Sequence, residues 1–140
     1  MIVTDAERIG PWVLSRMGGL WTPGRATAIG IEGPDGELRA GVLYEDYNGA
    51  SLVAHIAGEG RRWATREFLG RIFAYPFGQL GVRRITVVVP SSNTPSIRLA
   101  GRLGFTLEAR LLQAHPDGDL LVFCMFRSAC RYLRPPYVVD

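Results

Sequence analysis

The sequence predicts a mixed α/β fold, in which a mostly antiparallel sheet is flanked by helices. In the first half, the alternating run TAIGIE and two further strand-like runs are separated by the turn-forming segments GPDGE and Asn48-Gly49, which predicts antiparallel strands. In the second half, two predicted helices enclose RRITVVVP, a β-branched run typical of a central strand covered on both faces. The order of helix, three strands, helix, strand, helix and hairpin therefore predicts one sheet between helices.

The first predicted helix covers residues 5–18. Asp5 can cap its start. Pro11 lies inside it and predicts a late start or a kink, because proline lacks an N–H and its ring clashes with the preceding turn. The apolar face of this helix consists of Ile9, Trp12, Val13 and Met17.

Turn residues separate the three strands of the first half. TPGR breaks the chain before the first strand, GPDGE predicts a turn before the second, and Asn48-Gly49 predicts a tight turn before the third. The predicted strands are residues 27–32, 38–47 and 50–57.

The longest predicted helix covers residues 63–80. Pro76 should disturb its last turn, and Gly81 should end it. A central strand at residues 83–90 follows this helix. The buried stripe of the helix consists of Phe68, Leu69, Ile72, Phe73 and Leu80.

A short helix and a hairpin complete the chain. Asn93 or Thr94 can cap the helix, Pro95 fits its first turn, and Gly104 can end it. FTLEARLLQ and LLVFCMF then form a hairpin around the turn HPDGD, and SACRYL is a short closing segment.

Length and composition indicate one globular domain over residues 1–140. Apolar residues make up 47% of the chain and charged residues 21%, which is typical of a protein with an ordinary core. No apolar run reaches the roughly 18 residues of a membrane span, and the start lacks the layout of a secretory signal, so we expect a cytoplasmic protein without a membrane partner. Cys124 and Cys130 form no CxxC pair and are expected to be reduced thiols on strands, without a disulfide or a metal site.

The charge pattern is unusual because all 16 basic residues are arginine. One explanation is a GC-rich genome, which favours arginine codons. The alternative is that the protein modifies amines and therefore lacks lysine side chains, which would present amines of its own. The net charge of +3 is compatible with a phosphorylated cofactor or with nucleic acid, of which nucleic acid is the less favoured partner.

The segment HIAGEGRRWATREFL can hold a phosphate group before the 63–80 helix. The first N–H groups of a helix are unpaired and carry partial positive charge, glycines let a ligand approach the backbone, and arginines add charge-assisted hydrogen bonds. The alternative is that Gly58 and Gly60 only form a turn and that the arginines are solvated. A glycine pair before a helix does not decide between the two interpretations.

Residues 77–108 contain an aromatic residue, a leucine-glycine helix end, a basic residue that leads a strand, Asn93, Ser96 and then leucine-glycine-phenylalanine. With this pattern the segment resembles the GNAT superfamily of acyl-CoA N-acyltransferases, in particular the branch that acetylates the amino termini of ribosomal proteins. The chain is also similar to small GNAT-like proteins of tailed bacteriophages in its WATREFL and PDGDLL segments. The family pattern in residues 77–108 is matched without a gap by Phe77, Leu80, Gly81, Arg84, Asn93, Ser96, Leu103, Gly104 and Phe105.

The resemblance implies a GNAT-like fold whose central strands, 50–57 and 84–90, splay apart. Acetyl-CoA would lie between them, with its pyrophosphate on the loop before the 63–80 helix. Backbone N–H groups near residues 56–58 would polarise the thioester oxygen. The cofactor-binding residues that the resemblance implies are Ile56, Ala57, Gly58, Gly60, Arg61, Arg62, Trp63 and Asn93.

Two positions depart from the family pattern. The pyrophosphate loop aligns either as HIAGEG, beginning at His55, or as GRRWAT, in which Trp63 replaces a glycine and crowds the phosphate site. The family's tyrosine acid corresponds to Ala100 in this chain. Ser96 is the substitute that the resemblance suggests for protonating the leaving thiolate; its other interpretation is a packing or capping hydroxyl.

His55 and Glu45 are the candidate bases, because an amine must lose a proton before it can attack a thioester. His55 titrates near neutrality and lies where the central strands should diverge. A structural histidine is the alternative for His55, and a charge at the rim of a hairpin is the alternative for Glu45 and Asp46.

These observations predict an acetyl-CoA-dependent N-acetyltransferase that moves an acetyl group to a primary amine by direct transfer. The expected partner is a small-molecule or peptide amine, and the expected state is a monomer or homodimer. The alternatives are a GNAT-fold binding or phage structural protein without catalysis, and an acyltransferase associated with nucleic acid.

Overall fold

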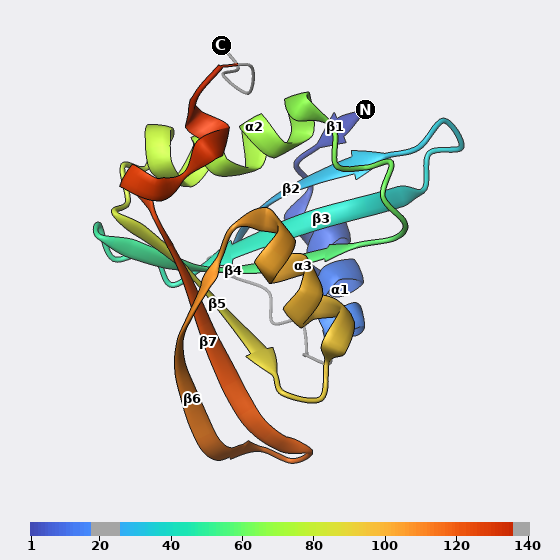
Figure 1. Ribbon diagram of the computed structural model, residues 1–140. Helices are drawn as coiled ribbons and strands as arrows, with labels where there is room; N and C mark the ends of the chain where they lie inside the picture. Colours follow the sequence, from blue (N-terminus) through green and yellow to red (C-terminus); the bar gives the residue numbers. More distant parts are fainter. Residues whose placement is uncertain (18–25, 136–140) are drawn as a thin grey trace.

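The computed structural model describes residues 1–17 and 26–135. Its centre is a single sheet in which the strands follow the order β1-β2-β3-β4-β5-β7-β6 (Figure 1). Only β4 and β5 pair in parallel, and all other neighbours are antiparallel, which confirms the predicted fold class. The strands are β1 (Ile2–Val3), β2 (Thr27–Glu32), β3 (Leu38–Glu45), β4 (Ser51–Gly58), β5 (Arg84–Pro90), β6 (Thr106–His115) and β7 (Gly118–Phe126).

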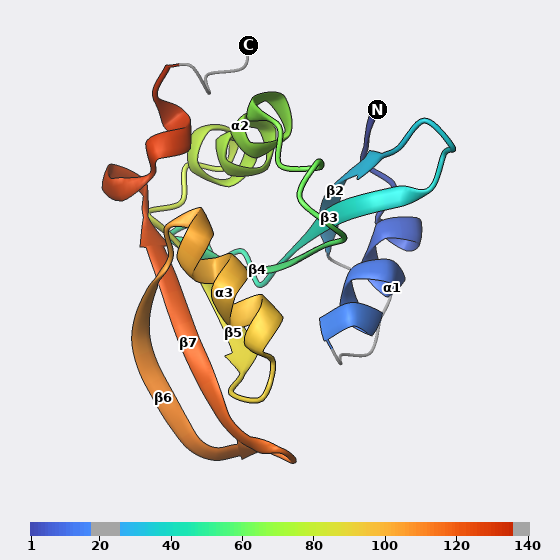
Figure 2. The same cartoon turned by 45° about the vertical axis from the view of Figure 1, so that its right-hand side comes forward.

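Helices cover both faces of the sheet. Helix α1 (Ala6–Met17) lies on one face, and α2 (Arg66–Ala74) and α3 (Thr94–Leu103) lie on the other (Figure 2). The larger part of the core lies beneath α2 and α3, and a smaller apolar cluster lies beneath α1. Among the described residues, no helix is long and apolar enough to cross a membrane.

Helix α1 begins before its proline, contrary to the late start that Pro11 suggested. Asp5 caps the helix through a hydrogen bond from the Glu7 N–H to Asp5 Oδ1 (3.1 Å). The helix approaches β3 closely because Gly41 has no side chain; a Cβ there would lie 2.8–2.9 Å from methyl groups of Ile9 and Val13. Gly18, the last residue predicted for this helix, and the TPGR turn lie outside the described residues.

Helix α2 is shorter than the predicted 63–80 helix. It begins at Arg66, because the Thr65 side chain caps it by accepting a hydrogen bond from the Phe68 N–H (3.2 Å). It passes into a turn of π-helix, Tyr75–Gln79, which contains Pro76, so the predicted disturbance by proline is confirmed. Gly81 follows with a φ of 69°, a conformation that favours glycine.

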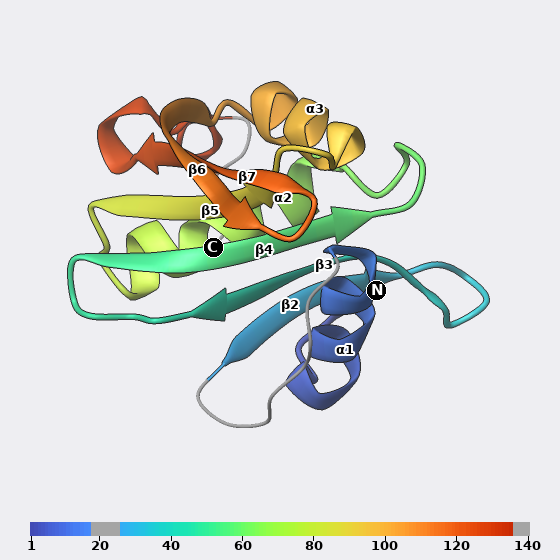
Figure 3. The same ribbon diagram turned by 90° about the horizontal axis from the view of Figure 1, so that it is seen from below.

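The sequence of β5 predicts a strand covered on both faces, but in the structure helices cover only one of its faces among the described residues. Ile85, Val87 and Val89 are buried beneath α2 and α3, but the residues between them are only half-buried. The reason is that α1 packs on β2, β3 and β4, away from β6 and β7 (Figure 3). One face of β5 and β7 is therefore left without a helix among the described residues.

The remaining elements differ in detail from the predictions. Strand β3 ends at Glu45 because Asp46 has a φ of 56°, outside the strand region. The final hairpin forms as predicted around Pro116 and Asp117. Cys124 lies on β7, but Cys130 lies between two 3-10 turns rather than on a strand, and both thiols are buried.

Candidate functional site

The central strands β4 and β5 separate after a short paired stretch. Their parallel register contains only the pairs Ser51–Arg84, Leu52–Ile85 and Val53–Thr86. Beyond Val53 and Thr86 the two strands diverge (Figure 1). This divergence confirms the predicted splay and leaves backbone edges of both strands facing a gap.

The hydrogen-bonding pattern of β4 identifies the amides that face this gap. The Glu59 N–H donates to Arg39 O (2.8 Å) on the β3 side. Because alternate residues of an antiparallel strand turn their amides to opposite edges, the N–H groups of Ile56 and Gly58 point towards β5. The Ala57 N–H points towards β3 instead. Two of the predicted backbone donors, Ile56 and Gly58, are thus oriented into the gap.

A cleft of about 670 Å³ opens between the end of β4, the β4–α2 loop, α3 and the C-terminal 3-10 turn. Arg62, the remaining residue predicted to bind the cofactor, instead lines a neighbouring cleft of about 540 Å³ that also contains Arg39. The predicted residues that line the larger cleft are Ile56, Ala57, Gly58, Gly60, Arg61, Trp63, Asn93 and Ser96.

The β4–α2 loop accommodates Trp63 by placing its indole in the core. The side chain is 6% exposed, and its Nε1 donates a hydrogen bond to Gly60 O (3.0 Å). The ring lies so close to Gly58 that a Cβ there would be 2.4 Å from it, and it meets Phe68 edge-on. Since α2 begins at Arg66, GRRWAT is the segment directly before the helix, and Trp63 forms a wall of the cleft without closing it.

The electrostatics of the cleft favour an anion. Gly60 has a φ of 69° and no atom within 4 Å of the position of a Cβ, so its backbone is open to a ligand. The beginning of α2 adds the partial positive charge of a helix N-terminus. Glu59 is the acidic residue in the cleft lining, whereas the basic residues there are Arg16, Arg61, Arg102 and Arg131.

Three of these arginines were not expected from the sequence. Arg16 belongs to α1, Arg102 to the end of α3 and Arg131 to the C-terminal 3-10 turn. Arg131 is held in place by donating to Arg102 O and to the Tyr132 hydroxyl, both at 2.8 Å. Arg102 lies within the 77–108 segment but is not one of its matched positions, and the three arginines come together only when their elements pack around the cleft.

The start of α3 brings Asn93 and Ser96 to the cleft. The Asn93 side chain caps the helix by accepting a hydrogen bond from the Ser96 N–H (3.2 Å), as the sequence predicted. The Ser96 side chain is half-buried and lines the cleft. Ala100, one turn further on, is buried and offers no acidic hydrogen.

His55 and Glu45 lie on the opposite face of the sheet. Ala54 and Ile56 belong to the core beneath α2 and α3, so His55, between them, points to the α1 face beside Leu43. His55 Nε2 lies 3.5 Å from Glu45 Oε1. The pair does not line the cleft and is separated from it by the sheet, next to the point where β4 and β5 diverge.

Burial lowers the pKa of His55 below its usual value, and the Glu45 and Asp46 carboxylates oppose this effect only in part. The imidazole is therefore neutral near pH 7 and can accept a proton. A neutral histidine beside two carboxylates suits the deprotonation of a cationic group.

The β6–β7 turn holds the other histidine in a local role. His115 Nδ1 accepts a hydrogen bond from the Asp117 N–H (3.1 Å). Asp119 accepts from the Gln113 N–H (2.8 Å) and from Arg110 (2.6 Å), and these bonds lower the pKa of its carboxyl group. The hydrogen bonds of this turn stabilise the hairpin, as the composition of HPDGD predicted.

Comparisons with known proteins identify the fold through structure alone. No protein-family model matches the sequence, and no curated protein matches it. The spermidine N-acetyltransferase of Vibrio cholerae in complex with CoA and spermine superposes with a TM-score of 0.62 at 18% identity, over 74% of this chain and 67% of that one. A dodecameric structure of the Vibrio cholerae enzyme in an intermediate state gives a TM-score of 0.61 at 20% identity, over 74% and 66%.

A chimera of the Vibrio cholerae enzyme with hSSAT matches equally well, with a TM-score of 0.61 and 19% identity over 74% of this chain and 68% of the chimera. The chain thus spans about two thirds of the length of these proteins. The identity is low, so the likeness concerns the fold; the resemblance to the ribosomal-protein and phage branches stays a prediction. With its splayed central strands and the cleft at the end of β4, the chain has the GNAT fold of these N-acetyltransferases.

Proposed function

We propose that the chain is an acetyl-CoA-dependent N-acetyltransferase that transfers an acetyl group directly to a primary amine. The observation that carries this proposal is the splay of β4 and β5 next to a cleft of about 670 Å³ with an arginine-rich lining. A sheet whose two central strands pair at three positions and then diverge leaves polar backbone groups without strand partners. A ligand with an amide-containing arm and a phosphate-bearing end satisfies both features.

The residues present fit acetyl-CoA. The open backbone at Gly60, the N-terminus of α2 and the side chain of Arg61 would hold the diphosphate. The N–H groups of Ile56 and Gly58 would donate hydrogen bonds to the arm or to the thioester oxygen. When bound, acetyl-CoA supplies an acetyl group activated as a thioester.

On the acceptor side, His55 would take the proton that an ammonium group must lose before its nitrogen can attack. Its lowered pKa keeps it neutral at pH 7, and Glu45 at 3.5 Å would stabilise the imidazolium that forms. The carboxylates of Glu45 and Asp46 favour an acceptor with positive charge. A small cationic amine is the class of acceptor that fits these groups.

Ser96 would assist the departure of the thiolate by donating a hydrogen bond from its hydroxyl in the cleft. A serine hydroxyl is a weak acid, and Ala100 provides no replacement for the tyrosine expected from the family resemblance. We therefore expect a modest turnover number.

Calorimetry with acetyl-CoA and acetyl transfer to spermidine test the proposal together. We expect saturable binding of acetyl-CoA and formation of an acetylated amine. His55→Gln should lower kcat/KM by about 10²–10⁴-fold and leave acetyl-CoA binding unchanged, because His55 lies on the face opposite the cleft. A wild-type protein that does not bind acetyl-CoA at millimolar concentration contradicts the proposal.

A second candidate is a GNAT-fold protein that binds ligands without catalysis. Two observations favour it, namely Trp63 in the loop and Ala100 at the acid position. Saturable acetyl-CoA binding by the wild type with no acetylated product from any of several primary amines would support this candidate. A salt-sensitive shift of duplex DNA would instead favour a role with nucleic acid.

A further inference from the structure

The loop proposed to receive a diphosphate contains an acidic side chain. Glu59 follows the last residue of β4, lines the cleft and is half-exposed. A carboxylate in this position repels a bound phosphate. The electrostatic fit of the loop to an anion therefore depends on what neutralises Glu59.

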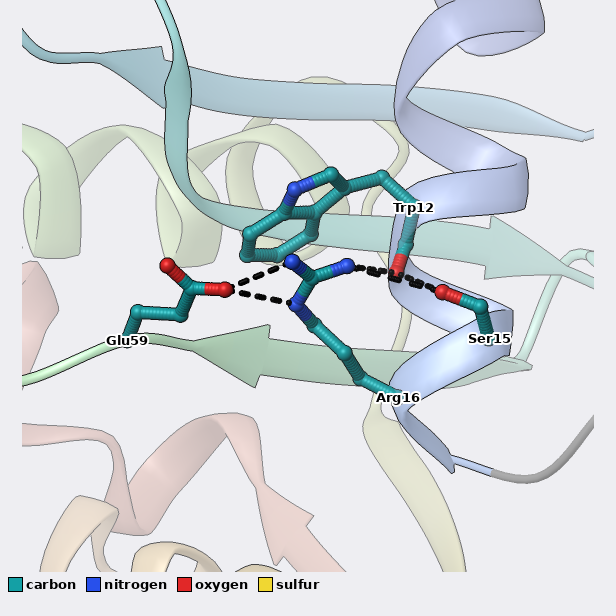
Figure 4. Close-up of polar contacts among 4 residues, drawn as sticks. All are labelled: Trp12, Ser15, Arg16 and Glu59. Atoms are coloured by element: carbon teal, nitrogen blue, oxygen red, sulfur yellow. Dashed lines mark hydrogen bonds and ion pairs between the residues drawn. The ribbon is translucent and has the colours of Figure 1, made fainter.

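Arg16, from the last turn of α1, is the partner of Glu59. Its Nε (3.1 Å) and Nη2 both donate to Glu59 Oε1 (Figure 4). Its Nη1 donates to Trp12 O (3.1 Å), and the guanidinium lies over the Trp12 ring at 3.6 Å from the centroid. The guanidinium is thus held in one position by contacts on three sides, with its charge against the carboxylate.

We propose that Arg16 is a positioning residue whose charge neutralises Glu59 and so makes the β4–α2 loop compatible with the diphosphate of CoA. The inference rests on the proposed function, because it assumes that the cleft binds CoA. It assigns the role to the charge of Arg16 rather than to a direct contact with the ligand. Helix α1, which covers the opposite face of the sheet, would in this way raise the affinity of the cleft for CoA.

Three variants distinguish an effect of the Arg16 charge from an effect of the physical link between α1 and the β4–α2 loop. They are Arg16→Met, Glu59→Gln and the double variant. We expect Arg16→Met to raise the Kd of CoA about tenfold, since it removes the ion-pair partner of Glu59 and leaves only the weaker electrostatic interaction with Arg39. Glu59→Gln alone should leave the Kd unchanged or slightly lower it. The double variant should return the Kd to within about twofold of the wild type, because both charges are gone.

A purely mechanical tie between α1 and the loop predicts a different pattern. Either single variant would break such a tie, so both would weaken CoA binding equally and the double variant would not recover. A direct contact of Arg16 with the ligand likewise predicts no recovery in the double variant. Failure of recovery therefore overturns the proposal in both cases.

Arg8→Met is the matched control. Arg8 lies on the same helix, pairs with Glu32 at 2.6 Å and has nearly the same side-chain exposure, 39% against 36% for Arg16. It does not line the cleft. The control removes one charge and one α1 ion pair, and it should leave the Kd of CoA unchanged.

Two further measurements fix the cause. Dephospho-CoA keeps the diphosphate, so the effect of Arg16→Met should persist with it; an effect seen only with CoA would contradict a role at the diphosphate. The effect should also shrink as salt screens the charges, whereas an effect independent of salt contradicts the proposal. If the wild type binds neither ligand, the proposed function itself has failed, which is distinguishable from an unchanged Kd in Arg16→Met.

Discussion

At the scale of single residues, His55 shows how burial sets the chemistry of a side chain. Desolvation disfavours its charged form and lowers its pKa, although Glu45 and Asp46 lie near enough to raise it. The folded protein therefore binds a proton at His55 less readily than the unfolded chain, whose histidine titrates near about 6.5. Protonation then favours the unfolded state.

This difference predicts that the free energy of unfolding falls as the pH drops below about 6.5. Above that pH, His55 is neutral in both states and contributes no slope. His55→Gln should flatten the slope between pH 7 and about pH 5.5. The carboxyl groups of Asp35, Glu108 and Asp119, whose pKa values are lowered by their hydrogen bonds, add their own slope only below this window. Urea unfolding at several pH values measures the slope.

The reference for this measurement is the wild-type protein unfolded in the same buffers. Equal slopes in the wild type and in His55→Gln would contradict the predicted pKa shift.

At the scale of elements, the β4–α2 loop depends on one glycine. Gly58 allows the Trp63 indole to lie directly against the end of β4, where its Nε1 donates to Gly60 O. Phe68, in the first turn of α2, packs against the same ring. The loop conformation, the wall of the cleft and the start of α2 are thus stabilised by a single buried side chain.

We expect Gly58→Ala to lower the free energy of unfolding by about 1–3 kcal/mol, because the new methyl group would overlap a buried ring with little room to move. The tryptophan emission should shift to longer wavelength as Trp63 leaves its site. Chemical denaturation followed by fluorescence measures both effects.

Gly101→Ala is the control for this substitution. Gly101 lies in α3 with no atom within 4 Å of the position of a Cβ, so alanine there should stabilise the protein by up to about 1 kcal/mol. If the two variants behave alike, close packing at Gly58 is not the cause.

At the scale of the whole molecule, the sheet separates two apolar clusters that share its strands. The larger lies beneath α2 and α3, and the smaller lies beneath α1. Neighbouring residues of β3 and β4 point alternately into the two clusters, so neither cluster can lose its order without disturbing the strands of the other.

This shared sheet predicts that residues 1–140 unfold as one cooperative domain. Far-ultraviolet circular dichroism, which reports helices and strands, and tryptophan fluorescence, which includes Trp63, should give the same thermal midpoint. Two separate midpoints would contradict a single domain. Sedimentation velocity on the same sample tests the expected monomer or homodimer.

Local sequence patterns predicted most of the elements correctly. The caps at Asp5 and Asn93, the turn at Gly81 and the alternation in the first strands each depend on residues a few positions apart. The errors have local causes too: Trp63 and Ala64 were assigned to a helix because apolar spacing does not show where a cap such as Thr65 lies. The β-branched run of β5 did not reveal that one of its faces lacks a helix.

The sequence by itself determined the fold class, the splay expected from the family resemblance, and the residues of the loop and of α3 that line the cleft. Only the tertiary structure decided that His55 lies on the face opposite the cleft, that Trp63 packs against Gly58, and that Arg16 forms an ion pair with Glu59. The physical reason is distance along the chain. Caps and turns are hydrogen bonds between near neighbours, whereas a cleft and its charges are set by side chains that meet only when separate elements pack together.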